Sequence, residues 1–70
     1  MNIEWEEGFT ISVSVNSDEV MISANRAGLL SLARQLTALA NEEPGAHVHY
    51  DTYNSLEDGS KQLIVELTAD

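Results

Sequence analysis

The 70-residue sequence contains no cysteine, a single proline and only three basic residues. The absence of cysteine excludes a disulfide framework, thiolate catalysis and cysteine-ligated zinc, and it fits a reducing compartment. No apolar run is long enough to cross a bilayer, and the first seven residues carry three acids and no base, which is the opposite of a secretory signal. We therefore expect a cytoplasmic protein whose fold is held together by packing alone.

Positive charge is scarce throughout the chain. The chain has twelve acidic residues and only three basic ones, Arg26, Arg34 and Lys61, so its formal net charge is -9. Such a balance repels nucleic acid and anionic membranes and favours a basic partner, although acidity that serves solubility explains it equally well. With 43% hydrophobic residues the composition is globular, and the length predicts one acidic domain over residues 1–70 with little room for a buried catalytic cleft.

Alternating hydrophobicity predicts strands in the first third of the chain. Apolar side chains occupy every second position at Phe9, Ile11, Val13 and Val15, with small polar residues between them. Ile3 and Trp5 continue the same parity, but one strand over residues 3–15 would span about 40 Å, which is too long for so small a domain. We therefore expect a turn at Glu7 and Gly8, and a short returning strand over residues 20–23.

A helix is predicted from Asn25, which is a good N-cap, to about Ala40. The segment over residues 41–45 ends it, because Pro44 cannot donate a ladder hydrogen bond and Gly45 favours a turn. Apolar residues at three- and four-residue spacing form one stripe along this helix, which we expect to be core: Leu29, Leu32, Ala33, Leu36, Leu39 and Ala40.

Two further strands are predicted over residues 46–51 and 61–67, which gives the order ββαββ and an α+β fold. We expect one mostly antiparallel sheet of four strands, or five if the N-terminal residues add one, with the single helix packed on one face. If the third strand pairs with the first, the sheet is wholly antiparallel in the order 2-1-3-4, whereas pairing with the second makes it mixed. The sequence leaves both orders open.

The side chains able to do specific chemistry concentrate in the second half of the chain. On the third strand Val48 and Tyr50 share an apolar face, while His47, His49 and Asp51 share the other face, which should meet water. Imidazoles two residues apart on a strand lie about 6.6 Å apart, close enough to chelate one metal ion with the carboxylate as an oxygen ligand. Solvated or partner-contacting histidines are the alternative interpretation.

The loop between the third and fourth strands is the second candidate for a site. Leu56 is an apolar anchor, and Glu57 and Asp58 place two acids at the tip of a turn. Tyr53 and Asn54 add an aromatic ring and an amide, a mixture common in recognition surfaces. Because the loop is longer than a hairpin needs, partner binding is one interpretation, and simple connection is the other.

Catalysis is not predicted. Ser55 or Ser60 could be placed beside a histidine, but no motif orients either hydroxyl toward a base. Glu57 and Asp58 are adjacent and exposed, an environment that does not separate a general acid from a general base. A phosphate-binding glycine loop is also absent. We expect no enzyme activity and no cofactor.

Three segments carry motifs that are specific in combination. They are the helix opening ANRAGLLSLA at residues 24–33, the strand PGAHVHYD at residues 44–51 and the turn YNSLEDGS at residues 53–60. Together they resemble the small bacterial immunity-protein family numbered thirty-two. The resemblance spans about residues 20–67, and the first fifteen residues match nothing in it.

The resemblance implies a protein that neutralises a toxin domain of a polymorphic toxin system and has no enzyme activity. It also implies that Asn25 caps the helix and that Gly28 makes a close packing contact. We expect the acidic sheet face and loop to bind a basic toxin surface, such as that of a nuclease. The expected partner-binding residues are His47, His49, Asp51, Tyr53, Asn54, Glu57 and Asp58. Two alternatives stay open: a metal-binding module built on the two histidines and Asp51, and a homo-oligomer formed through exposed sheet edges.

Overall fold

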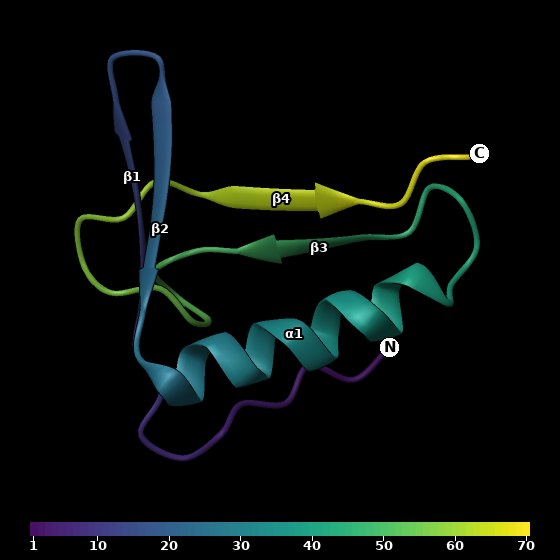
Figure 1. Ribbon diagram of the computed structural model, residues 1–70, viewed down its shortest axis with the longest axis horizontal. Coiled ribbons are helices and arrows are strands. Elements are labelled where there is room, and N and C mark those ends of the chain that lie inside the picture. Colours follow the sequence, from purple (N-terminus) through teal and green to yellow (C-terminus); the bar gives the residue numbers. More distant parts are fainter.

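Four strands and one helix follow one another in the predicted order ββαββ. The computed structural model describes residues 1–70, and its elements are β1 (Ile11–Asn16), β2 (Glu19–Ala24), α1 (Arg26–Ala40), β3 (His47–Tyr50) and β4 (Leu63–Glu66). Figure 1 shows α1 along one side of the molecule and the β1–β2 hairpin running across the direction of β3 and β4. The α+β class is confirmed. The helix is neither long nor apolar enough to span a bilayer.

The strands form two separate antiparallel sheets, so the prediction of one sheet of four strands is wrong. In the first sheet β1 pairs with β2, from Ile11 opposite Ala24 to Asn16 opposite Glu19. In the second sheet β3 pairs with β4, and Tyr50 lies opposite Leu63. Because β1 pairs with neither β3 nor β4, the question of strand order within one sheet disappears.

The long connection between β3 and β4 explains why the sheets stay apart. We name residues 51–60 the acidic loop. Its Glu57 amide donates to the carbonyl of Ile11 at 2.9 Å, and the following Lys61 amide donates to the carbonyl of Val13 at 2.9 Å. The Val13 amide in turn donates to the hydroxyl of Ser60 at 3.1 Å. The loop thus occupies the edge of β1 that a third strand would need.

Residues 1–10, which we name the N-terminal segment, contain no strand, so the fifth strand considered above is absent. The predicted turn is confirmed, since Gly8 has a φ of 79° and the Phe9 amide donates to the Glu6 carbonyl at 3.2 Å. Figure 1 shows this segment running beside α1. Trp5 stacks on Phe9 at a ring-centroid distance of 4.2 Å and meets the ring of Tyr50 edge-on at 5.9 Å.

The N-terminal segment is fastened to α1 by polar side chains. The hydroxyl of Ser31 accepts a hydrogen bond from the Glu6 amide at 2.8 Å, and Nε2 of Gln35 donates to the Glu4 carbonyl at 2.7 Å. Gln35 also accepts from the hydroxyl of Tyr50 at 2.8 Å. Both polar side chains are buried and both are satisfied, as buried polar groups must be if they are not to destabilise the fold.

This attachment rotates the helix away from the predicted orientation. Leu32 and Leu39 are buried as expected, but Leu29 and Leu36 are 54% and 41% exposed. Two further members of the predicted stripe, Ala33 and Ala40, are also exposed. The face turned inward instead carries Gly28, Ser31, Leu32, Gln35 and Leu39. The apolar stripe therefore lies half in the core and half on the surface.

The start of α1 joins three parts of the chain. The Asn25 side-chain oxygen accepts from the Gly28 amide at 2.8 Å and from the Thr10 amide at 3.0 Å, while its amide group donates to the Gly8 carbonyl at 2.9 Å. A Cβ at Gly28 would overlap the carbonyl oxygen of Thr10. The expectations of an N-cap and of a close glycine contact are both confirmed.

The hydrophobic core lies where α1, both sheets and the acidic loop meet. Trp5 and Phe9 from the N-terminal segment pack against it from outside. Val48 and Tyr50 are buried, as their strand parity predicted, and so is the expected anchor Leu56. Its buried members are Ile11, Val13, Leu32, Leu39, Val48, Tyr50 and Leu56.

Candidate functional site

The outward face of β3 carries two neighbouring imidazoles. His47 and His49 are exposed, while the alternate residue Val48 is buried, because side chains on a strand point to opposite faces in turn. The two rings meet edge-on with centroids 4.9 Å apart. The predicted wet strand face is therefore present and is accessible to a partner.

Hydrogen bonds give the two histidines different tautomers. Nδ1 of His47 lies 3.1 Å from the Gly45 carbonyl, which can only accept, so this nitrogen carries the proton. Nδ1 of His49 lies 3.2 Å from Nε2 of Gln62, which donates, so this nitrogen is the acceptor. Both Nδ1 atoms are therefore already hydrogen-bonded, which leaves the two Nε2 atoms without a partner inside the protein.

Asp51 does not join the histidines on the strand face. Its Oδ1 accepts from the amides of Tyr53 at 2.9 Å and Asn54 at 3.0 Å, and its carbonyl accepts from the amides of Ser55 and Leu56. The carboxylate therefore folds the start of the acidic loop instead of pointing along the strand. No group of three or more histidine, aspartate or glutamate side chains is placed to hold a metal ion.

Asn54 also serves the architecture of the loop. Its side-chain oxygen accepts from the Asp51 amide at 3.1 Å, and its amide group donates to the His49 carbonyl at 2.9 Å. These bonds tie the turn back onto the end of β3. Sequence reasoning placed Asp51 and Asn54 in a contact surface, whereas their polar atoms in the structure are engaged in holding the loop.

The serines are likewise used to hold the loop. Ser55 donates its hydroxyl proton to the side-chain oxygen of Asn54, and the hydroxyl of Ser60 accepts from the Val13 amide. Neither hydroxyl is hydrogen-bonded to a histidine. The geometry that a serine nucleophile needs is therefore missing at both positions.

The remaining side chains of the acidic loop are free. Tyr53 is 97% exposed, and Glu57 and Asp58 are exposed beyond the buried anchor Leu56, which is 5% exposed. None of the three free side chains makes a hydrogen bond or an ion pair within the protein. A hydrogen-bonded backbone thus presents one aromatic ring and two carboxylates to solvent.

The charge of the molecule is almost wholly uncompensated by ion pairs. Arg34 and Glu6 form the one salt bridge in the structure, between the helix and the N-terminal segment. Arg26 and Lys61 form none. Since the chain has a formal charge of -9, the surface field is negative and attracts cationic surfaces over about a Debye length.

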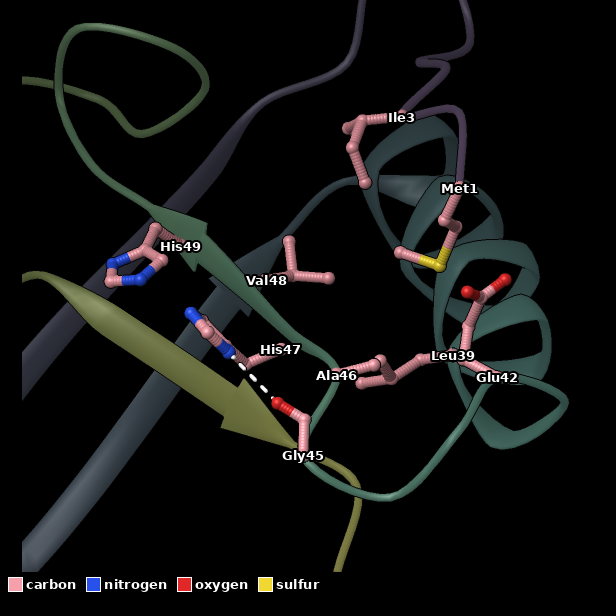
Figure 2. A pocket seen from close by; sticks show the side chains of 9 residues that line it. All are labelled: Met1, Ile3, Leu39, Glu42, Gly45, Ala46, His47, Val48 and His49. Carbon is pink, nitrogen blue, oxygen red and sulfur yellow. Dashed lines mark hydrogen bonds between the residues drawn. The ribbon is translucent and has the colours of Figure 1, made fainter.

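An open pocket of about 410 Å³ lies on the N-terminal side of β3. Figure 2 shows Val48 pointing toward Ile3 and Leu39, while His47 and His49, which also line the pocket, project from the other side of β3. Met1 and Glu42 complete its rim. Sequence reasoning missed this pocket because two of its walls belong to the N-terminal segment, whose position beside the helix had no signal in the hydrophobic pattern.

The structure is thus a small α+β fold that presents an acidic loop held by hydrogen bonds. The family model described as immunity protein 32 matches residues 19–68. This match covers more than half of the chain, which therefore belongs to the immunity protein 32 family, as the motifs of the helix, strand and turn predicted. No curated protein and no solved structure matches the chain.

Proposed function

We propose that this protein binds and neutralises a cognate bacterial toxin domain as a stoichiometric inhibitor in the cytoplasm. Membership of the immunity protein 32 family is the observation that carries the proposal. Inhibition by an immunity protein requires a stable complementary surface and no chemical step, which agrees with the engagement of both candidate serines in the loop.

The proposed contact surface consists of the outward face of β3 and the free side chains of the acidic loop. His47, His49, Tyr53, Glu57 and Asp58 supply the contacts. An exposed tyrosine gives a large contact area at low cost in conformational entropy, and a loop that is already ordered loses little freedom on binding. The five side chains thus combine an aromatic anchor with charge and hydrogen-bonding groups.

Asp51 and Asn54 support this surface from below. Their hydrogen bonds fix the backbone from which Tyr53 projects. In this division of roles, loss of either side chain weakens binding by loosening the loop, and it does so without removing a group that the toxin touches.

The partner is a toxin domain with a basic surface. The protein's charge of -9 raises the rate of encounter with such a surface, and it disfavours anionic partners such as nucleic acid or membranes. A nuclease toxin fits this requirement, because the surface that holds nucleic acid must itself be positive.

Charge reversal in the acidic loop tests the proposal. The double variant Glu57→Lys/Asp58→Lys should lower the association rate with the cognate toxin domain by about tenfold or more at low salt, with a smaller loss at high salt. Surface plasmon resonance and protection of toxin-expressing cells provide the two readouts.

The matched control is Glu42→Lys/Glu43→Lys, which changes the net charge equally at exposed positions after the end of α1. If both double variants lower the rate to the same extent, overall charge and not the acidic loop drives binding. An unchanged rate and full protection with the loop variant would contradict the proposed surface.

A further inference from the structure

The two outer edges of the β1–β2 hairpin differ in their backbone hydrogen bonding. The edge of β1 is closed, since the carbonyls of Ile11 and Val13 accept hydrogen bonds from the acidic loop and the residue after it. No segment pairs with the outer edge of β2.

The two-residue turn of the hairpin determines which groups of β2 remain free. Asn16 and Glu19 flank the turn and exchange hydrogen bonds, so the alternation of an antiparallel pair turns the N–H and C=O groups of Val20, Ile22 and Ala24 outward. The same alternation turns Ile11 and Val13 outward on β1, where they do bond to the loop. The β2 edge therefore presents three residues with free backbone groups.

This edge has little of what usually prevents strand pairing. Natural edge strands are protected by charged side chains, above all lysine, by proline or by a β-bulge, and the one charged residue of β2 is Glu19 beside the turn. β2 has the sequence EVMISA and pairs with β1 in an unbroken register. Its three consecutive apolar side chains, Val20, Met21 and Ile22, are 64%, 58% and 44% exposed. The outer edge of β2 is thus a surface suited to receiving another strand.

We propose that β2 pairs with β2 of a second copy of this chain, in antiparallel orientation about a two-fold axis at Ile22. The two hairpins then form one four-stranded sheet. In this register Ile22 lies opposite its counterpart and Val20 lies opposite Ala24, so all the outward groups pair in about six ladder hydrogen bonds. The interface is isologous, as in most protein dimers.

The charges at the two ends of β2 favour this partner and this register. Asp18 lies in the turn before β2, and Arg26 begins α1 just after it. With Ile22 on the axis, Asp18 of each copy approaches Arg26 of the other copy. Arg26 forms no salt bridge within its own chain. Acid and base are thereby matched at both ends of the interface, despite the negative charge of each copy.

The apolar side chains agree with the same register. Val20 and Ile22 share one face of the hairpin with Val13, since Ile22 lies opposite Val13 and Val20 opposite Val15. With Ile22 on the axis, this face continues without interruption into the second copy. A register shifted by one residue would place the apolar row of one copy beside the polar row of the other.

Backbone hydrogen exchange tests the pairing without any substitution. Between about 10 µM and 1 mM protein, the amides of Val20, Ile22 and Ala24 should become protected as concentration rises, while sedimentation shows conversion to twice the monomer mass. The amides of Met21 and Ser23 bond within the hairpin and should be protected throughout.

Two sets of variants test the register. Ile22→Lys places two ammonium groups on the axis and should yield a monomer, whereas Met21→Lys, on the same strand but away from the axis, should weaken the dimer less. Asp18→Arg and Arg26→Asp should each weaken dimerisation about tenfold, and combining them should restore it. Circular dichroism verifies that each variant is folded.

Several outcomes would overturn the proposal. They are a wild-type monomer at about 1 mM, a dimer that tolerates Ile22→Lys, and charge reversals whose effects add instead of cancelling. Protection of Val20 and Ile22 amides only when a toxin is added would assign the edge to a strand of that toxin and would equally reject pairing between two copies.

Discussion

The N-terminal segment and the acidic loop are both irregular, and both are held by side-chain hydrogen bonds to the backbone, yet they do opposite things. The first places Trp5 and Phe9 against the core. The second buries Leu56 alone and leaves Tyr53 97% exposed. The direction of the apolar side chains, and not the presence of regular structure, thus separates a segment that stabilises the fold from one that presents a surface.

The two segments also differ in whether the family model matches them. The acidic loop lies inside the region matched by the immunity protein 32 family, residues 19–68, and the N-terminal segment lies outside it. Even so, the buried polar residues of α1, Ser31 and Gln35, find partners in the N-terminal segment. The region matched by the family model therefore depends on the unmatched N-terminal segment for hydrogen-bond partners of two buried side chains in α1.

The largest expected difference between the two segments is the loss of stability when an aromatic residue of each is replaced by alanine. Trp5→Ala removes contacts with Phe9 and Tyr50 and should lower the free energy of unfolding by about 2 to 4 kcal/mol. Tyr53→Ala, the control in the acidic loop, should change it by less than about 0.5 kcal/mol. Urea unfolding measures both, and equal losses would contradict the assigned roles.

Replacing the asparagine that anchors each segment should give a smaller difference in stability. Asn25→Ala removes the cap of α1 and both links to the N-terminal segment, and should cost about 2 kcal/mol. Asn54→Ala loosens only the loop and should cost about 1 kcal/mol. Proteolysis should then cut the Asn54 variant first within the acidic loop; cleavage elsewhere would show that the loop is held by other contacts.

The smallest expected effect is a loss of stability at alkaline pH that arises from Tyr50, whose ring contacts Trp5 of the N-terminal segment. Burial raises the pKa of its phenol, so the neutral form is favoured in the folded state. Its contribution to stability is complete below the unfolded value of about 10 and is lost as pH rises through the folded pKa. Stability measured from about pH 8 to 11 should fall less steeply for Tyr50→Phe than for the wild type; identical slopes would exclude this contribution.

Local features could be predicted from the sequence because local physics decides them. Strand alternation identified β1 and the buried positions Val48 and Tyr50, and the N-cap identified the start of α1 at Asn25. The turn at Gly8 followed from the excessive length of a continuous strand. Each of these depends on residues close together in the chain.

Features that depend on distant segments could not be predicted. The hydrophobic stripe indicated Leu29 and Leu36 as core, but the helix turns Ser31 and Gln35 inward because another segment supplies their hydrogen-bond partners. The split into two sheets arises from an irregular loop that bonds to β1, and loops carry no periodic signal.

In the candidate site, parity correctly placed His47 and His49 on an exposed face. Parity does not predict the hydrogen bonds of Asp51, because β3 ends at Tyr50 and the Asp51 carboxylate accepts from the amides that follow it. An aspartate at the end of a strand readily accepts such local hydrogen bonds, so this position predicts a turn residue more strongly than a metal ligand.

The way the acidic loop is fastened has a consequence for its divergence between related proteins. Its shape is held by backbone bonds and by Asp51, Asn54, Leu56 and Ser60. The side chains at Thr52, Tyr53, Glu57 and Asp58 take no part in that fastening. Substitutions at these four positions can therefore change the charge and shape of the loop surface while the chain keeps its fold, so a toxin contact of the kind proposed could change without loss of stability.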